Sequence, residues 1–396
     1  MVSLSRVTTS EVFLIPSKQK LLNTGIDVDV SLSAVTRGAD AVGWERPMKV
    51  YQIDPITDAR WAEFVERHPS SSVFHTVGWL QALKRTYGYV PVAFTTSPPS
   101  GDLKNGIVFC RIDSWLTGRR LVSLPFSDHC EPLCDSGEDA NFLIRNLQNA
   151  LVQQKWKYLE LRPINANFGQ MGDNANFLAA ENYFLHRLDL SPDLNSVFRG
   201  LDKDSVQRRI QRAERAGLVE KCGRSNDLLK DFYALFVITR RRHRLPPIPY
   251  EWFNNLIRYK DKSVKIRLAY KDDIPMAAIL TLDFRNILYY KYGCSDSQFN
   301  KFGATPWLLW RAIESGKSSG ANQFDMGRTQ ADNAGLLAFK NHWVSQPERL
   351  VYRKFPESSV VGSIDRWKLQ MAKRIFSHMP ERLLTITGRL IYRHIG

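Results

Sequence analysis

Cysteine is scarce in this sequence, and nothing in it resembles a disulfide framework. The 396 residues contain only five cysteines, an odd number, scattered at Cys110, Cys130, Cys134, Cys222 and Cys294. Small secreted proteins that depend on disulfides carry dense and usually even sets of cysteines. We therefore expect reduced thiols and a cytoplasmic protein.

Long apolar runs and local catalytic signatures are missing as well. No run of about 18 apolar residues occurs, which excludes a membrane-spanning helix, and the apolar patch at residues 12–15 is too short for a secretory signal. There is no phosphate-binding loop, no His-Glu-x-x-His and no Gly-x-Ser-x-Gly. Cys130 and Cys134 lie near Asp128 and His129, but their spacing is loose and no second ligand pair follows. We expect no metal ion.

Acidic residues are few relative to basic ones. The chain has 55 Lys and Arg against 40 Asp and Glu, a formal charge of +15, and its pI is near 9.6. Because 43% of the residues are apolar and 24% are charged, the composition is that of a globular protein. The charge excess favours a polyanionic partner, which could be a nucleic acid, a diphosphate-bearing substrate or an acidic membrane surface.

The pattern along the chain predicts two α/β units, preceded by a polar N-terminal extension and followed by a basic C-terminal tail. Residues 1–47 are polar and aperiodic, so we expect a flexible extension, and the native start is either Met1 or Met48. Residues 48–187 and 188–356 each alternate strand and helix patterns, which favours a duplicated domain with a mixed sheet. The basic tail, residues 357–396, predicts amphipathic helices that either pack on the body or dock on a membrane surface.

Three groups of charged side chains could serve a site. Glu160 and Arg162 share one face at the end of a buried strand, where they either pair structurally, the preferred interpretation, or line a pocket. Arg208, Arg212 and Arg215 form a stripe on a basic helix predicted over residues 203–217. Such a stripe either grips phosphate groups or simply faces water. A second basic cluster, residues 240–243, ends in His243.

The stretch 324–343 offers the third group. Asp325 alternates with apolar neighbours as a strand runs out, which would leave Arg328 at its tip, where ligands often bind in α/β sheets. Phe339 and Lys340 follow on a helix, and a lysine beside a hydrophobic wall can stabilise a developing oxyanion. In residues 288–296, alternation places Tyr292 on the face opposite to Tyr289; core packing is the preferred use of both.

Taken in order, several of these stretches resemble one family. They are VFHTVGWLQALKRTYGYVPV, RRLVSLPFSDHCEP, YLELRP, RRIQRAERAGL, TRRRHRLPPIP, YYKYGCSD, FGATPWLLWRAIE, and FDMGRT with NAGLLAFKNHW. Together they resemble the FemAB-like acyltransferases, most closely the Fem-related proteins of bacterial exopolysaccharide and exosortase gene clusters, over about residues 50–355. The resemblance implies α/β (α+β) architecture with tandem Gcn5-related N-acetyltransferase (GNAT) domains, each a mixed sheet flanked by helices.

The resemblance also implies an activity and a site. Family members transfer an aminoacyl group to an amine on a nucleotide- or lipid-linked precursor, so we expect acyl transfer in peptidoglycan or exopolysaccharide assembly. Phe339 and Lys340 match the family's Phe-Lys position near the reacting carbonyl, which assigns Lys340 to the oxyanion. Arg328, Arg208 and Arg212 become candidate phosphate contacts, with Arg162 and Phe339 also assigned to substrate. Asp128, Glu160 and Asp325 are candidate proton acceptors or positioning groups, and Tyr292 and His243 are further candidates.

Two departures leave the donor open. The long helical hairpin that peptidoglycan enzymes use for tRNA is replaced by the modest helix at 203–217, and the glycine-rich pyrophosphate loop is reduced to Lys301-Phe302-Gly303-Ala304. The anionic cosubstrate is therefore either aminoacyl-tRNA or acyl-CoA, with no bound cofactor and no DNA partner. The alternative is a non-catalytic scaffold that binds an acidic glycan or lipid-linked intermediate. Either protein would be cytoplasmic, free or peripheral on the inner face of the membrane.

Overall fold

A computed structural model describes residues 48–165, 178–260, 263–356, 376 and 379–395. The extension predicted over residues 1–47 and residues 357–375 of the predicted tail lie outside the described residues. All described residues belong to one compact unit, which begins at Met48. No helix in the described part of the chain is long and apolar enough to cross a membrane.

The first half of the unit contains five strands and three α-helices. They are β1 (Tyr51–Ile53), α1 (Ala59–Arg67), α2 (Val77–Tyr87), β2 (Val90–Thr95), β3 (Ile107–Ser114), β4 (Gly118–Val122), α3 (Gly137–Gln153) and β5 (Tyr158–Leu161). Helix α1 begins at Asp58, whose carboxylate accepts from the Arg60 amide, and α2 ends at Gly88 in the left-handed conformation. These signals are local, so the helix and strand patterns of the sequence match the structure closely here.

The second half follows a similar order. Its elements are β6 (Leu178–Asp189), α4 (Leu194–Gly200), α5 (Arg208–Arg215), β7 (Val219–Gly223), α6 (Asn226–Arg242), α7 (Tyr250–Lys260), β8 (Val264–Lys271), β9 (Ile274–Phe284), β10 (Ile287–Ser295), α8 (Ala304–Ser318), β11 (Gln323–Gln330), α9 (Ala334–Asn341), β12 (Glu348–Phe355) and α11 (Glu381–Ile395). The basic helix predicted over 203–217 is shorter, because residues 203–207 form a π-helical turn before α5.

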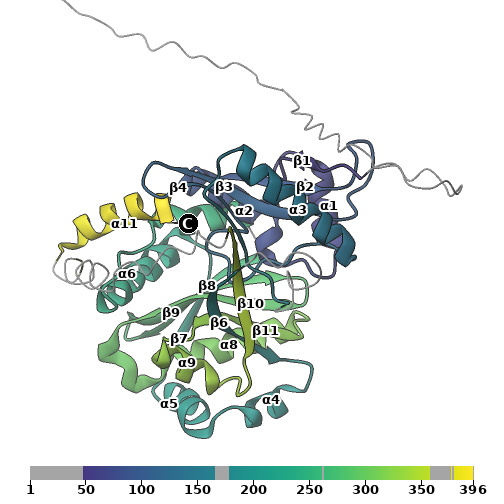
Figure 1. Cartoon of the computed structure of the whole chain (residues 1–396). Helices are drawn as coiled ribbons and strands as arrows, with labels where there is room; N and C mark the ends of the chain where they lie inside the picture. Colours follow the sequence, from purple (N-terminus) through teal and green to yellow (C-terminus); the bar gives the residue numbers. More distant parts are fainter. Residues whose placement is uncertain (1–47, 166–177, 261–262, 357–375, 377–378, 396) are drawn as a thin grey trace, which may run out of the picture. The chain divides into compact units, whose positions relative to one another are not determined.

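All described strands form one sheet of 12 strands in the order β1-β2-β3-β4-β5-β12-β6-β11-β10-β9-β8-β7. Each half contains an antiparallel run that ends in a parallel pair joined through a helix, β4-α3-β5 in the first and β10-α8-β11 in the second. The last strand, β12, then pairs with β5 of the first half and with β6. Figure 1 shows these central strands passing between the two groups of helices. The predicted mixed-sheet fold is confirmed. The strands of the two halves join edge to edge into the single sheet.

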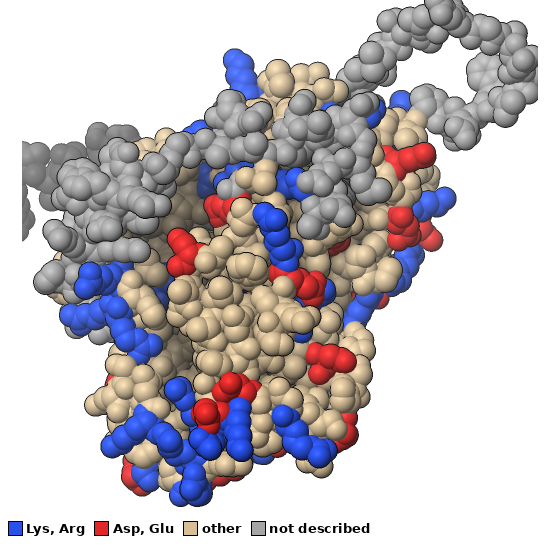
Figure 2. Space-filling view, turned by 60° about the horizontal axis from the view of Figure 1, so that its bottom comes forward, with Lys and Arg blue, Asp and Glu red and all other residues tan. Residues whose placement is uncertain are grey.

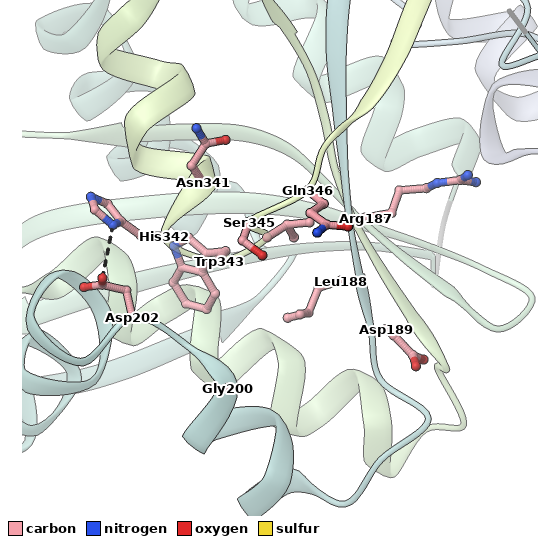
Figure 3. A pocket seen from close by; sticks show the side chains of 11 residues that line it. Arg187, Leu188, Asp189, Gly200, Asp202, Asn341, His342, Trp343, Ser345 and Gln346 are labelled. Atoms are coloured by element: carbon pink, nitrogen blue, oxygen red, sulfur yellow. Dashed lines mark ion pairs between the residues drawn. The ribbon is translucent and has the colours of Figure 1, made fainter.

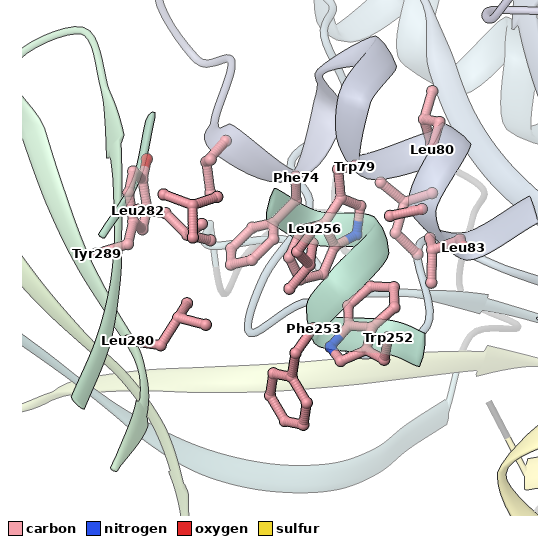
Figure 4. Close-up of a cluster of buried hydrophobic side chains, with 14 of the residues drawn as sticks. Phe74, Trp79, Leu80, Leu83, Trp252, Phe253, Leu256, Leu280, Leu282 and Tyr289 are labelled. Atoms are coloured by element: carbon pink, nitrogen blue, oxygen red, sulfur yellow. The ribbon is translucent and has the colours of Figure 1, made fainter. Parts of the chain in front are cut away.

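The largest hydrophobic cluster contains residues from both halves. Helix α2 of the first half packs against α7 of the second, and Trp79 and Trp252 meet edge to face with ring centroids 5.1 Å apart. Figure 4 shows this contact together with Leu280, Leu282 and Tyr289 of the sheet. The boundary predicted between residues 187 and 188 falls near the end of β6 and remains a prediction, because sheet and core are both shared.

Two details of strand register differ from the alternation predicted by the sequence. A β-bulge between Tyr290 and Tyr292 shifts the pairing of β10 with β9. Because of it, Tyr289 and Tyr292 pack into the same core cluster, so the prediction that they occupy opposite faces is wrong. Strand β11 continues to Gln330, so Arg328 lies within the strand rather than at its tip, just after a second irregularity.

Candidate active site

The last turn of α9 places three successive side chains in three different surroundings. Phe339 lines one pocket, the Lys340 side chain is buried, and Asn341 lines a second pocket. Successive side chains of an α-helix point about 100° apart, so three neighbouring residues within one turn can face three different surroundings. The Phe339–Lys340 pair named by the sequence resemblance therefore lies where a pocket meets a buried group of charges.

Lys340 is 3% exposed, and its ammonium is bound by backbone oxygens. Its Nζ donates to the carbonyl oxygens of Gly327, at 2.9 Å, and Arg328, at 3.1 Å. Burial lowers the pKa of Lys340 to about 8, while the carboxylates of Asp128 and Asp325 oppose that shift. Most of the Lys340 amine therefore remains charged at neutral pH.

Asp128 and Lys291 form a second buried pair beside it. Lys291 Nζ donates to Asp128 Oδ2 at 2.7 Å, with 6% and 16% of the two side chains exposed. Burial would raise the pKa of Asp128, but the charges of Lys291, Arg328 and Lys340 outweigh it, and the pKa is lowered from 3.8. Burial lowers the pKa of Lys291 despite Asp128. Three aromatic rings surround its ammonium, those of Phe74, Trp79 and Tyr292, at 5.2, 5.8 and 5.7 Å.

A histidine–aspartate pair completes the charged group. His129 Nε2 lies 3.0 Å from Asp325 Oδ2, and since a carboxylate only accepts, Nε2 carries the proton. The other oxygen of Asp325 accepts from the Gly327 amide at 2.7 Å. His129 Nδ1 has no hydrogen-bond partner among the described residues. Asp325 therefore contacts both the imidazole of His129 and the backbone of Gly327, whose carbonyl oxygen accepts from Lys340.

The backbone at Gly327 has no room for a side chain. Its φ is +71°, and a Cβ atom there would lie 3.1 Å from the carboxylate of Asp128. Gly327→Ala is expected to lower the free energy of unfolding by about 1 to 3 kcal/mol and to displace Asp128. Gly335→Ala, in the open on α9, is the control and should be neutral or stabilising by up to about 1 kcal/mol. Chemical denaturation of both variants measures the free energy of unfolding. Equal stability of the two variants would contradict the expected backbone strain at position 327.

Arg328 lies against two aromatic rings instead of reaching out from a strand end. Its guanidinium carbon is 4.2 Å from the ring centroid of Tyr183 and 4.9 Å from that of Tyr352. The hydroxyl of Tyr352 in turn donates to the Asp128 carbonyl oxygen at 2.7 Å. Strand β12 thus holds the loop that carries Asp128, and Arg328, packed against rings of β6 and β12, adds positive charge near the Asp128 carboxylate.

The pocket beside Phe339 is basic and lies at the start of α8. It has a volume of about 540 Å³, and its lining residues include Arg209, Arg212, Lys301, Gly303 and Phe339. Gly303, with φ +75°, lets the α5 backbone approach, since its Cβ would lie 2.4 Å from the Arg209 carbonyl oxygen. Basic side chains gather at the lower left of the face in Figure 2, and α5 lies on this lower side of the molecule in Figure 1. Backbone amides at a helix start together with arginines suit phosphate groups.

A second pocket, of about 510 Å³, lies on another side of α9. Figure 3 shows His342, just after α9, facing Asp202, and the Trp343 ring between Asp202 and Leu188 of β6. His342 Nδ1 is 3.5 Å from the Asp202 carboxylate. The sequence predictions included none of the residues that line this pocket.

Several predicted site residues lie elsewhere or are fully engaged. Glu160 pairs with Arg162 at 2.8 Å and with Lys354 at 3.2 Å, which matches the preferred prediction of a structural pair. Tyr292 accepts from the Trp252 indole at 2.8 Å within the aromatic core. His243 is exposed at the end of α6 and lines neither pocket.

The basic stripe is also divided. Arg208 pairs with Asp204 and does not line the pocket, whereas Arg212 does line it. Arg209, which the stripe pattern left out, is the second arginine of the pocket. The role of the stripe in binding stays a prediction. The packing of α5 on Gly303 decides which of its side chains border the pocket.

Sequence reasoning missed Lys291 and His129 as members of the charged group. Lys291 lies in a run of tyrosines whose pattern predicts core packing. Its partner Asp128 comes close only through the β10 bulge and the approach of the loop that carries Asp128. His129 was considered only for a metal site. Among the described residues no group of three or more His, Cys, Asp or Glu side chains is placed to hold a metal ion, and the absence of a metal remains a prediction.

Comparison with known proteins identifies the fold. Residues 203–341 match the family model described as an acetyltransferase (GNAT) domain. The crystal structure of FemX is similar with a TM-score of 0.62 and 14% identity, covering 82% of this chain and 100% of that chain. None of the curated proteins compared matches the sequence.

Two further solved structures resemble the chain. One is the C-terminal domain (DUF2156) of a putative lysylphosphatidylglycerol synthetase from Agrobacterium fabrum, with a TM-score of 0.50, 13% identity, and coverage of 81% of this chain and 96% of that one. The other is a tandem GNAT protein from the clavulanic acid biosynthesis pathway, with a TM-score of 0.50, 10% identity, and coverage of 77% and 97%.

Residues 203–341 therefore match a GNAT domain, and the chain has the tandem GNAT fold. Its similarity to the structure of FemX agrees with the FemAB-like fold that the resemblance of the sequence implied. These findings support an acyltransferase.

Proposed function

We propose that the chain transfers an acyl or aminoacyl group from a phosphate-bearing donor to an amine on a cell-envelope precursor, in peptidoglycan or exopolysaccharide assembly. The observation that carries this proposal is the position of Lys340. Lys340 follows Phe339 in the chain, and Phe339 lines the basic pocket. The buried ammonium of Lys340 lies near the ionised carboxylate of Asp128. A donor bound in that pocket would present its carbonyl at the boundary between the two side chains.

The donor pocket suits either cosubstrate that the sequence left open. Aminoacyl-tRNA and acyl-CoA both carry phosphate groups, which lie near the aminoacyl ester in the first and at the far end of the pantetheine arm in the second. Arg209, Arg212 and Lys301 offer cationic side chains for such groups, and α8 directs the amides of its first turn toward the same pocket. One of the similar structures is described as a domain of a putative lysylphosphatidylglycerol synthetase, and that description agrees with transfer of an amino acid to a lipid.

The reaction forms a C–N bond and breaks the bond between the acyl carbon and the oxygen or sulfur of the donor. As the amine attacks, the carbonyl oxygen becomes negative, and charged Lys340 stabilises it. The proton that the amine loses goes to Asp128 and later to the leaving group. All three candidate carboxylates have charged or hydrogen-bonded partners, but the side chain of Asp128, paired with Lys291, is 16% exposed, whereas those of Glu160 and Asp325 are only 7% and 3% exposed.

The test of the donor site compares two arginines of α5 that line the pocket with one that does not. The double variant Arg209→Gln/Arg212→Gln should bind the donor at least about tenfold more weakly, because each lost contact is a hydrogen bond to a charged group. Arg208→Gln, on the same helix but paired with Asp204 and outside the pocket, should bind within about twofold of wild type.

Shifts in melting temperature with acetyl-CoA, longer acyl-CoAs and charged aminoacyl-tRNA measure this binding. A shift with one donor that the double variant loses identifies the cosubstrate class. If the two sets of variants behave alike, the donor does not bind in this pocket. If none of the donors shifts the wild-type protein, the non-catalytic alternative, a scaffold that binds an acidic glycan or lipid-linked intermediate, is favoured instead.

A further inference from the structure

Helix α11 is held firmly against the body by one of its faces. Leu384 is fully buried and Tyr392 is 8% exposed, while at Gly388 a Cβ atom would lie 2.1 Å from the Pro247 carbonyl oxygen. The hydroxyl of Tyr89 donates to the Tyr392 carbonyl oxygen at 2.6 Å, and the hydroxyl of Thr117 donates to that of His394 at 2.8 Å. Figure 1 shows α11 beside α6 and the end of the sheet formed by β3 and β4. The orientation of its outer face is therefore fixed.

That outer face is apolar. Leu383, Ile386 and Leu390 are 53%, 55% and 62% exposed, and at 100° per residue they fall on a single stripe opposite Leu384 and Tyr392. Arg389 and Arg393 are exposed along one side of this stripe. An ordinary surface helix turns its large aliphatic side chains inward only, whereas α11 carries them on its outer face as well.

A second element extends the stripe. The turn between β3 and β4 carries Trp115, which is 87% exposed, and Leu116, which is 61% exposed. The ring of Trp115 lies 5.6 Å from that of His394 at the end of α11. Residues from two distant parts of the sequence thus form one surface, which we call the α11 surface: Trp115, Leu116, Leu383, Ile386 and Leu390, bordered by Arg389 and Arg393.

We propose that the α11 surface docks on an anionic lipid bilayer. A helix with aliphatic side chains on one face and flanking arginines lies in the plane of the membrane interface, where tryptophan is also favoured. The arginines complement acidic headgroups, and the +15 charge of the chain adds attraction at longer range. A second copy of the chain is the weaker occupant, because it carries the same positive charge. The proposal does not depend on the donor or on acyl transfer.

The first experiment is co-sedimentation with vesicles. The full chain should bind vesicles that contain phosphatidylglycerol and bind vesicles of phosphatidylcholine alone much more weakly. The variant Ile386→Ser/Leu390→Ser should lose at least about tenfold in affinity. The control Val219→Ser/Ile274→Ser removes two aliphatic side chains of similar exposure, 57% and 50%, outside the α11 surface and should bind like wild type. Arg389→Gln/Arg393→Gln should weaken binding about fivefold for each charge removed.

A spectroscopic measurement separates docking from loss of fold. Vesicles should shift the tryptophan emission of the wild-type protein to the blue, and Trp115→Phe should remove most of the shift. Absence of wild-type binding to acidic vesicles, or equal binding by the α11 and control variants, would overturn the proposal. So would self-association that the Ile386→Ser/Leu390→Ser variant abolishes without any effect of lipid, because the surface would then be an interface between copies. Donor binding measured on the same samples keeps this outcome apart from failure of the proposed function.

Discussion

Lys340→Met is expected to reduce acyl transfer by about a hundredfold or more, the usual cost of removing one donor to an oxyanion. Methionine keeps the length of the side chain and its apolar contacts but cannot donate. The measurement is single-turnover transfer with the donor identified by the binding experiment. Lys301→Met, which removes an exposed lysine from the wall of the same pocket, is the control and should alter donor affinity rather than the rate of the bound complex. Wild-type turnover in Lys340→Met would remove the residue from the mechanism.

The same variant should be at least as stable as wild type. Keeping a lysine charged when its pKa has fallen from 10.5 to about 8 costs the folded state about 3 kcal/mol at neutral pH. Methionine avoids that cost and loses the hydrogen bonds to Gly327 and Arg328, so a net gain of about 1 kcal/mol is expected. Between pH 8 and 10.5 the unfolded wild-type chain holds the proton more tightly than the folded one. Wild-type stability therefore rises relative to the variant over that range.

The pH dependence of the reaction gives an independent check. If charged Lys340 stabilises the oxyanion, transfer should decline as the pH rises through about 8. If Lys340 instead accepted the proton from the amine, the rate would rise over the same range. The sign of the change therefore distinguishes the proposed role from the opposite one.

Asp128→Asn is expected to impair both stability and transfer. It leaves the Lys291 ammonium buried without its carboxylate, which should lower the free energy of unfolding by about 3 kcal/mol. It removes the proposed proton acceptor, which should slow transfer about a hundredfold. It also removes a charge that raises the pKa of Lys340, so the decline in rate should begin at a lower pH than in wild type.

The double variant Asp128→Asn/Lys291→Met separates these effects. Without the second charge, most of the lost stability should return, because no unpaired ammonium remains buried. Transfer should remain slow if Asp128 accepts the proton. Full recovery of both stability and rate would show that Asp128 serves only to neutralise Lys291, and the proton acceptor would have to be sought elsewhere. Denaturation curves and single-turnover rates on the four proteins of the cycle provide the comparison.

Local chemistry explains why the sequence predicted most of the elements. The capping carboxylate of Asp58 and the glycine at position 88 mark helix ends within a few residues, and apolar periodicity identifies the buried faces. The same logic placed Glu160 with Arg162, which are two residues apart on one strand. It failed at the β10 bulge, because one extra residue reverses the face of every side chain that follows, and no local signal marks its position.

Composition and periodicity were enough to predict the mixed α/β class, the excess of positive charge and the basic α5 helix, and family resemblance pointed to the Phe339–Lys340 pair. The return of β12 between β5 and β6, which brings Asp128 of the first half to Lys291 and Lys340 of the second, depends on pairing between distant strands and appears only in the folded chain. Their shifted pKa values arise from burial and from charges that only the fold brings together, such as Asp128 with Lys291 and Lys340. The apolar outer face of α11 likewise became visible only once its opposite face had a place to pack.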